Sequence, residues 1–206
     1  MRQRTWIPVV AGLALVAVAL QIPTALSQVS TAAAPEKTAA AAAPHSAAAS
    51  KNTMAVAVVH GLGEHKVKGK VTFTQKADGV EIVAELTGLQ PGEHGFHVHE
   101  FGDCSMADGK CAGGHFNPTG MPHGSPDSEK RHVGDFGNIK ADSTGKATYK
   151  RLDTMIALNG PNSVIGRSVI VHAKADDLKT QPSGDAGDRI GCGTIGIADP
   201  KMQMAH

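Results

Sequence analysis

The chain has 206 residues, and 20 Lys and Arg against 19 Asp and Glu give it a formal net charge of +1. This balance argues against a nucleic-acid-binding protein, which usually carries a basic excess, and the low charged fraction with 24 glycines argues against a coiled coil or long helical bundle. Aromatic residues are scarce but histidines number 11, so the histidines are the first place to look for function.

Residues 1–27 have the pattern of a secretory signal peptide: two arginines at the start, an uncharged apolar stretch over 7–20, and small side chains within 25–27. The apolar stretch is shorter than the roughly 20 residues of a membrane-spanning helix. Extending it to Leu26 leaves an uncleaved anchor as the alternative. We therefore expect a periplasmic or secreted protein of the bacterial cell envelope, with membrane contact only through such an anchor.

Residues 28–53 are rich in alanine, are interrupted by Pro35 and Pro44, and contain little that could pack into a core. Prolines break helices, so this segment is predicted to be a flexible linker. We expect the folded domain over residues 54–199, followed by a disordered tail at 200–206.

The folded part is predicted to be all-β. Short runs rich in strand-forming residues recur between turn signals, and Val71 and Phe73 alternate with polar neighbours, the period of a half-buried strand. The predicted strands cover residues 54–59, 69–75, 80–86, 95–100, 137–141, 147–151, 168–172 and 192–197. No segment shows a convincing helical period, so we expect an eight-stranded antiparallel β-sandwich or flattened barrel.

A long segment between residues 100 and 137 is dense in Gly, Pro, Asp and His and has little strand character. A loop of this length is uncommon in a compact domain unless function or ligation holds it. Just before it, alternation along a strand places His97 and His99 on one face, while Phe96 and Val98 point to the other.

Further metal-ligand side chains follow: His115, His123, His132 and Asp135 fall in the long segment, and His172 ends a predicted strand. Together with the strand pair, six imidazoles and one carboxylate exceed the four ligands of one tetrahedral zinc. Two metal sites are therefore expected, and nitrogen-rich ligation favours zinc, copper or nickel.

Several motifs make the pattern specific. They are Gly-Phe-His-Val-His-Glu-Phe-Gly-Asp at 95–103, Gly-Gly-His-Phe-Asn-Pro at 113–118, Arg-His-Val-Gly-Asp at 131–135, Val-His-Ala-Lys-Ala-Asp-Asp at 171–177 and Arg-Ile-Gly-Cys-Gly-Thr-Ile-Gly at 189–196. In this order they resemble the copper–zinc superoxide dismutase family, in its bacterial secreted type, over about residues 54–199. The resemblance implies a Greek-key fold with long metal-binding and electrostatic loops.

The resemblance also implies an antioxidant enzyme that converts two superoxide radicals and two protons to oxygen and hydrogen peroxide by Cu(II)/Cu(I) cycling, with zinc structural. It assigns one copper to His97, His99, His115 and His172, and one zinc to His115, His123, His132 and Asp135. The shared histidine would bridge the metals and take up a proton when copper is reduced. Asp176 matches the aspartate that links a copper ligand to a zinc ligand, and Arg189 matches the arginine of the substrate channel.

The cysteines suit an oxidising compartment. By the same resemblance, Cys192 is one half of a disulfide, and Cys104 matches the bacterial position of its partner. Cys111 lies nearer to the eukaryotic position, so Cys104–Cys192 is the expected pair, with Cys111 free or in an intermolecular link. His94 matches a position with a structural role and receives no metal.

The segment from Lys174 to Arg189 is shorter than the eukaryotic electrostatic loop, and Asp185 and Asp188 add negative charge to it. Our hypothesis is that Arg189 and Lys179 attract most of the superoxide. A homodimer remains open, and no nucleic-acid partner is expected. The alternatives are a protein that buffers copper or zinc without turnover, and a structural sandwich domain on a stalk.

Overall fold

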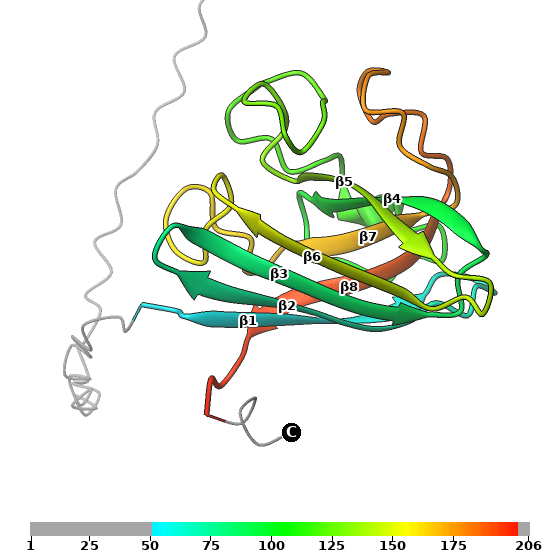
Figure 1. The fold of residues 1–206 in the computed structure, drawn as a ribbon, viewed down its shortest axis with the longest axis horizontal. Coiled ribbons are helices and arrows are strands. Elements are labelled where there is room, and N and C mark those ends of the chain that lie inside the picture. The colour runs from blue at the N-terminus through cyan, green and yellow to red at the C-terminus, as the bar shows by residue number, and fades with distance from the viewer. Residues whose placement is uncertain (1–50, 202–206) are drawn as a thin grey trace, which may run out of the picture. The chain divides into compact units, whose positions relative to one another are not determined.

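Eight antiparallel strands form the described part of the chain, residues 51–201 of this computed structural model (Figure 1). The strands are β1 (Met54–Gly61), β2 (Lys68–Lys76), β3 (Gly79–Thr87), β4 (Gly92–His99), β5 (Asp135–Ala141), β6 (Ala147–Asp153), β7 (Ser168–His172) and β8 (Arg189–Ile197), with one short 3₁₀ helix, η1 (Lys110–Ala112). Within these residues, no helix has the length and apolar character needed to cross a membrane. The predicted signal peptide, nearly all of the linker and most of the tail lie outside the described residues.

The strands close into a barrel in the order β1-β2-β3-β6-β5-β4-β7-β8. The neighbours β3–β6 and β4–β7 are not consecutive in the chain, which gives the expected Greek-key crossovers. Between β5 and β6 a single pair, Ala141 and Ala147, joins the two halves. The all-β prediction is confirmed. The two four-stranded halves of the barrel are joined by five residue pairs between β1 and β8 on one side, and by the Ala141–Ala147 pair alone on the other.

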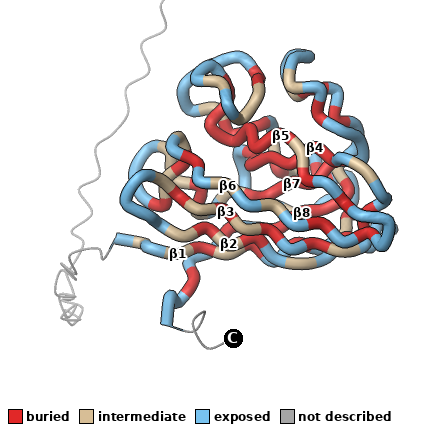
Figure 2. Tube along the Cα trace, in the orientation of Figure 1, coloured by how far each residue is buried: buried red, intermediate tan, exposed pale blue. Residues whose placement is uncertain are grey.

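Alternating apolar side chains fill the barrel. Along β1 the inward positions Ala55, Ala57 and Val59 are buried, and β2 and β3 follow the same alternation (Figure 2). At the centre, the ring of Phe96 packs 5.1 Å from Tyr149 and 5.8 Å from Phe136, measured between ring centroids. Every residue of β7 is buried, and Ile170 packs with Leu62, just after β1, and with Ala112 of η1.

The long segment between β4 and β5 is fixed to the edge of β4. The N–H of Val98 donates to the carbonyl of Gly134, and the Val98 carbonyl accepts the N–H of Phe116. A side chain at position 134 would come within 2.3 Å of the Val98 oxygen, so only glycine allows this close approach. The segment is therefore ordered by backbone hydrogen bonds, although it contains little regular structure.

The expected disulfide is present: Cys104 in this segment is bonded to Cys192 in β8, 88 residues away. Both sulfur atoms pack into a small apolar cluster with Leu62, Ala112 and Ile170 on the outside of the barrel. The disulfide thus ties the long segment to the sheet. Cys111 is free, and its thiol donates to the carbonyl of Asp103 at 3.0 Å.

Replacing both bonded cysteines with serine should lower the free energy of unfolding by about 4–5 kcal/mol, because the unfolded chain would no longer be closed into a large loop. Urea denaturation followed by circular dichroism measures the change. Cys111→Ser is the matched control and should leave the midpoint nearly unchanged. A loss in the double variant no larger than in the control would contradict the stabilising role of the disulfide.

Candidate metal centre

Six histidines and one aspartate, all buried, lie together beside the barrel. They form two groups of four, and within each group the potential ligand atoms lie within 4.8 Å of one another. The first group is His97, His99, His115 and His172, and the second is His115, His123, His132 and Asp135. All seven residues predicted from the sequence are thus brought together. Asp135, which was expected in the long loop, is instead the first residue of β5.

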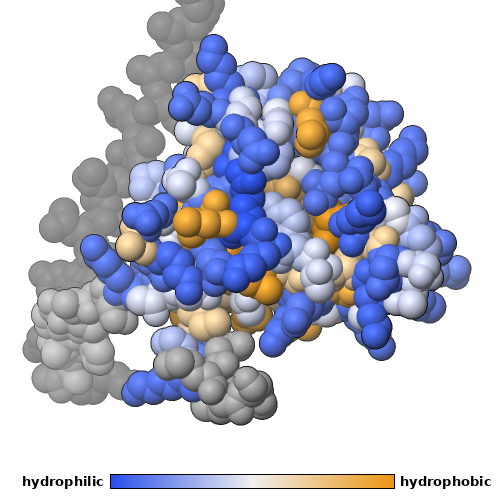
Figure 3. Space-filling model, viewed as in Figure 1, coloured by the Kyte–Doolittle hydropathy of each residue, from blue (hydrophilic) through white to orange (hydrophobic). Residues whose placement is uncertain are grey.

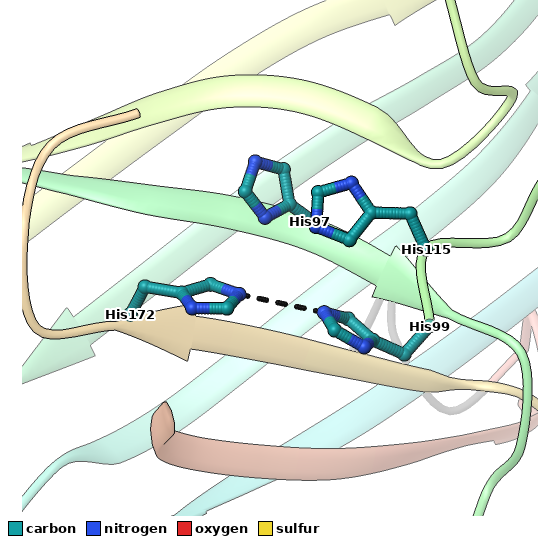
Figure 4. Close-up of side chains that lie close together, drawn as sticks. All are labelled: His97, His99, His115 and His172. Atoms are coloured by element: carbon teal, nitrogen blue, oxygen red, sulfur yellow. Dashed lines mark hydrogen bonds between the residues drawn. The ribbon is translucent and has the colours of Figure 1, made fainter. Parts of the chain in front are cut away.

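The first group lies between two strands and the long segment (Figure 4). His97 and His99 come from β4, His172 ends β7, and His115 follows η1. Nδ1 of His99 donates to the Gly113 carbonyl at 3.0 Å, and Nδ1 of His172 donates to the Gly187 carbonyl at 3.1 Å. Since a carbonyl can only accept, each neutral ring must present a bare Nε2.

These two bare nitrogens face each other at 3.4 Å, the contact dashed in Figure 4. Burial lowers the pKa of His172 to about 4 and keeps the pKa of His99 well below its usual value, so neither ring carries an extra proton at neutral pH. Two lone pairs directed at each other repel unless a cation lies between them. This arrangement therefore fits a metal ion.

The other two members of the first group contribute in the same way. His97 is bonded through Nε2 to Asp176, which leaves its Nδ1 buried without a hydrogen-bond partner, and Nε2 of His115 is equally without one. Burial lowers the pKa of His97 to about 3, so this ring is also neutral. Four imidazole lone pairs thus converge, a donor set that suits copper or zinc.

The second group is built around the carboxylate of Asp135. Its oxygens lie 2.8 Å from Nδ1 of His115, 3.1 Å from Nδ1 of His123 and 3.2 Å from Nδ1 of His132. Burial would raise the pKa of Asp135, but the contacts with the three histidines outweigh it and hold the carboxyl ionised. Nδ1 of His123 and Nδ1 of His132 make no well-directed hydrogen bond, so three nitrogens and a carboxylate surround one position, as in a tetrahedral zinc site.

One imidazole belongs to both groups. Nδ1 of His115 faces Asp135, while its Nε2 faces the first group. The ring is nearly fully buried, and burial lowers its pKa. A single histidine can therefore bridge two metal ions.

Asp176 connects the two groups from behind. One carboxylate oxygen accepts from His97 at 2.8 Å and the other accepts from His123 at 3.0 Å. Burial opposes protonation of His123, but its contacts with Asp135 and Asp176 raise the pKa of this ring to about 9. Asn138 holds the backbone of Asp176 by two hydrogen bonds, of 2.7 and 2.8 Å.

Two of the residues around Asp176 were missed by the sequence analysis. Asn138 reads as an ordinary strand residue, and only its pairing with the backbone of Asp176 shows its role. At Gly184, where φ is +68°, a side chain would lie 1.8 Å from the Asp176 carboxylate. A turn glycine offers no sequence signal for such a contact.

A cavity of about 470 Å³ opens onto the first group, with His99, His115, His172, Ser183 and Arg189 in its wall. Arg189 is the one Lys or Arg among the residues that line it, and Glu100 is its one acid. The guanidinium donates to the carbonyls of Gly109 and Gly113, each at 2.6 Å. Because Gly113 also accepts from His99, one carbonyl fixes both the cation and a member of the histidine group.

The remaining histidines of the described residues belong to neither group. The ring nitrogens of His94 are 2.8 Å from the carbonyl oxygens of His172 and Gln90, which suits a structural role. His60 is an exposed residue of β1, and His65 is exposed in the segment that follows.

The fold and the site define a β-barrel metalloprotein with two adjacent, histidine-rich metal sites. Comparison with known proteins agrees: residues 67–195 match the family described as copper/zinc superoxide dismutase. The chain belongs to this family. It is 48% identical over 158 residues to the protein named Superoxide dismutase [Cu-Zn] of Paramecium bursaria Chlorella virus 1, which covers 72% of this chain and 80% of the viral protein.

A solved structure is also similar. The crystal structure titled as that of the clock protein EA4 matches with a TM-score of 0.66 and 43% identity, over 72% of this chain and 96% of that one.

Asp176→Asn should weaken the binding of copper and zinc by roughly 10- to 100-fold, because an amide cannot accept from both rings and the histidines lose their fixed orientation. Competition with a chelator of known affinity measures the change. Asp177→Asn is the control, since that exposed carboxylate only caps Lys179 and Thr180. Equal metal affinities in the two variants would show that Asp176 does not orient the ligands.

Proposed function

We propose that this chain is a superoxide dismutase, which converts two superoxide radicals and two protons into oxygen and hydrogen peroxide as an antioxidant defence. The observation that carries the proposal is the shared ring of His115, held between a four-histidine group and a second group that contains Asp135. A cavity with a single lining cation opens onto this ring. A small anion fits this setting better than a large organic substrate.

The donor sets fit the two metals that the family uses. We propose that copper is held by His97, His99, His115 and His172, and zinc by His115, His123, His132 and Asp135. When bound, copper supplies the one-electron cycling between Cu(II) and Cu(I) that the reaction needs, whereas zinc has no redox chemistry. One copper and one zinc per chain follow from this assignment.

His115 is suited to carry a proton. Its Nδ1 stays beside Asp135, so the ring keeps its place while Nε2, which faces the first group, takes up a proton and passes it to the reduced substrate. Burial lowers the pKa of this ring, so an added proton is released readily. Asp176 keeps the neighbouring rings of His97 and His123 oriented during the cycle.

Arg189 is suited to attract the anion. Two of its five N–H donors are used by backbone carbonyls, which fix the guanidinium and leave the others for the cavity. Lys179, the second charge of our hypothesis, is exposed and does not line the cavity, whereas the side chain of Lys174 lies against the lining residue Gly187. Lys179 would therefore act only at longer range.

The test is metal analysis combined with a superoxide assay. Wild-type protein should hold one copper and one zinc per chain, lose activity with a chelator and regain it with both metals. Arg189→Gln should lower kcat/KM at least tenfold and weaken its salt dependence, since steering raises encounter rates by 10- to 1000-fold. In the same assay, Arg189→Lys shows whether a positive charge is enough for activity or the guanidinium is needed. Lys179→Glu shows whether the charge of Lys179 helps to attract the substrate.

Two outcomes would contradict the proposal. Tightly bound metals without turnover would favour the metal-buffering alternative. A melting temperature that a chelator does not change would favour the structural sandwich domain.

We also propose that the protein is of the bacterial secreted type and works in the periplasm or outside the cell, where it meets external superoxide. The signal pattern of residues 1–27 and the disulfide between Cys104 and Cys192 support this, since disulfides persist in oxidising compartments. The mass of the protein recovered from the envelope tests it. A chain that keeps residues 1–27 in the membrane fraction would indicate the uncleaved anchor instead.

A homodimer through the outer face of β1 and β8 is the assembly we propose. Val58 on β1 is 70% exposed and, by the β1–β8 register, lies opposite Thr194 on the outer face. Phe101, 58% exposed, is close by, because it precedes Gly102, whose carbonyl accepts from Thr194. By contrast, Figure 3 shows a largely hydrophilic face over β3 and β6 with scattered apolar spots. Such exposed apolar neighbours are typical of a contact surface.

Sedimentation equilibrium should give twice the chain mass for wild-type protein. Val58→Glu should give the single mass, because a carboxylate would be buried at the contact without a partner. Leu152→Glu, at an exposed apolar position on β6, is the control and should leave the dimer intact. A monomeric wild-type protein would overturn this assembly.

A further inference from the structure

A charged network lies behind the second metal group, and the proposed chemistry does not use it. The side chain of Arg131 is among the largest that are fully buried, and Asp153, its ion-pair partner, is completely buried as well. Removing two charges from water costs free energy that their attraction often fails to repay. General stability is therefore a weak explanation for this pair.

Arg131 grips the turn that carries two of the proposed zinc ligands. Its Nη1 donates to the carbonyls of His132, Val133 and Asp135, each at 3.1 Å. One nitrogen thus fixes the backbone on both sides of this turn. The side chains of His132 and Asp135 leave the same turn toward the second group.

Asp153 anchors the guanidinium to the barrel. One of its carboxylate oxygens accepts from Nη2 of Arg131 at 2.5 Å and from Nε of Arg151 at 3.3 Å. The other accepts the N–H groups of Met155 and Ile156 at 2.9 and 3.1 Å. Asp153 is the last residue of β6, which pairs with β3 along its whole length, so the anchor is rigid.

Arg151 also binds the loop, at residues that come earlier in the chain. Its Nη1 pairs with the carboxylate of Asp127 at 2.8 Å, and its Nη2 donates to the carbonyl of Pro126. Both contacts lie between His123 and His132 in the chain. The end of β6 therefore holds the loop at two separate points.

We infer that Asp153, Arg131 and Arg151 form a clamp that positions the ligands of the second group for zinc. This inference rests on the proposed function, which assigns zinc to that group. The ligands come mostly from an irregular loop, so their order must be set by contacts outside the site. Without the clamp, part of the free energy of zinc binding would be spent on ordering the loop, so the affinity for zinc would fall. None of the three residues is itself a ligand, so they are positioning residues.

The test compares Asp153→Asn and Arg151→Gln with wild-type protein. Zinc affinity is measured by chelator competition, and cobalt bound in place of zinc reports the site geometry through its visible spectrum. Asp153→Asn should raise the zinc dissociation constant by roughly 10- to 100-fold and alter the cobalt spectrum, the range seen when residues behind metal ligands are lost. Arg151→Gln should give a smaller change in the same direction.

Lys150→Gln is the matched control. It also removes a charge from β6, but Lys150 forms its ion pair with Glu81 of β3 and not with the loop, so the zinc affinity of this variant should match wild-type. If Asp153→Asn fails to fold, Arg151→Gln decides, because the Arg151 side chain is partly exposed. A purely structural role would lower the melting temperature of the metal-free variants and leave zinc affinity and the cobalt spectrum unchanged, and this result would overturn the clamp.

Failure of the clamp can be told from failure of the proposed function. Wild-type protein that binds no zinc through His123, His132 and Asp135 would overturn the assignment of the site itself. Wild-type protein that binds zinc, with variants that bind it equally well, would overturn the clamp alone.

Discussion

The convergence of bare imidazole nitrogens is the constraint on which this structure depends. Each ring of the first group is oriented by a hydrogen bond at the nitrogen that points away from the metal position. The acceptors are backbone carbonyls for His99 and His172, Asp176 for His97 and Asp135 for His115. These acceptors fix the tautomers before any metal arrives. Lone pairs that face one another at close range have no favourable arrangement without a cation, so the apo site is organised for a metal at a cost that binding relieves.

The two halves of the barrel contribute to this convergence in different ways. The half that contains β4, β5, β7 and β8 supplies every strand-borne member of the two groups, together with Arg189. The other half supplies no ligand, yet its strand β6 holds the loop through Asp153 and Arg151. The cavity therefore opens beside one half, while the opposite half acts as a rigid support.

Local patterns predicted much of this arrangement. The alternation of Val71 and Phe73 with polar residues marked a strand, and the spacing of His97 and His99 placed both on one face, because strand geometry acts over adjacent residues. The family resemblance supplied the ligand set and the pairing of Cys104 with Cys192. The two-metal expectation and the disulfide agree with the groups and the bond that the structure shows.

Contacts between distant residues could not be predicted in this way. Arg131 and Asp153 look like ordinary surface charges in the sequence, and only the folded chain brings them together and buries them. The strand β5 begins at Asp135 instead of Gly137, because Asp135 pairs with His97 of β4 although aspartate is depleted in strands. The choice between sandwich and barrel rests on the one pair formed by Ala141 and Ala147, which no periodicity encodes.

That single pair also has a consequence for motion. Strands joined by few hydrogen bonds have a low free energy of local opening. We therefore expect the barrel to open first between β5 and β6, and amide exchange to be faster there than at its other strand pairs. The bond between Arg131 and Asp153 spans the same boundary from the loop side. Metal binding and local opening between β5 and β6 would then be coupled. Bound metal would slow this opening, and the two strands would separate more often without it.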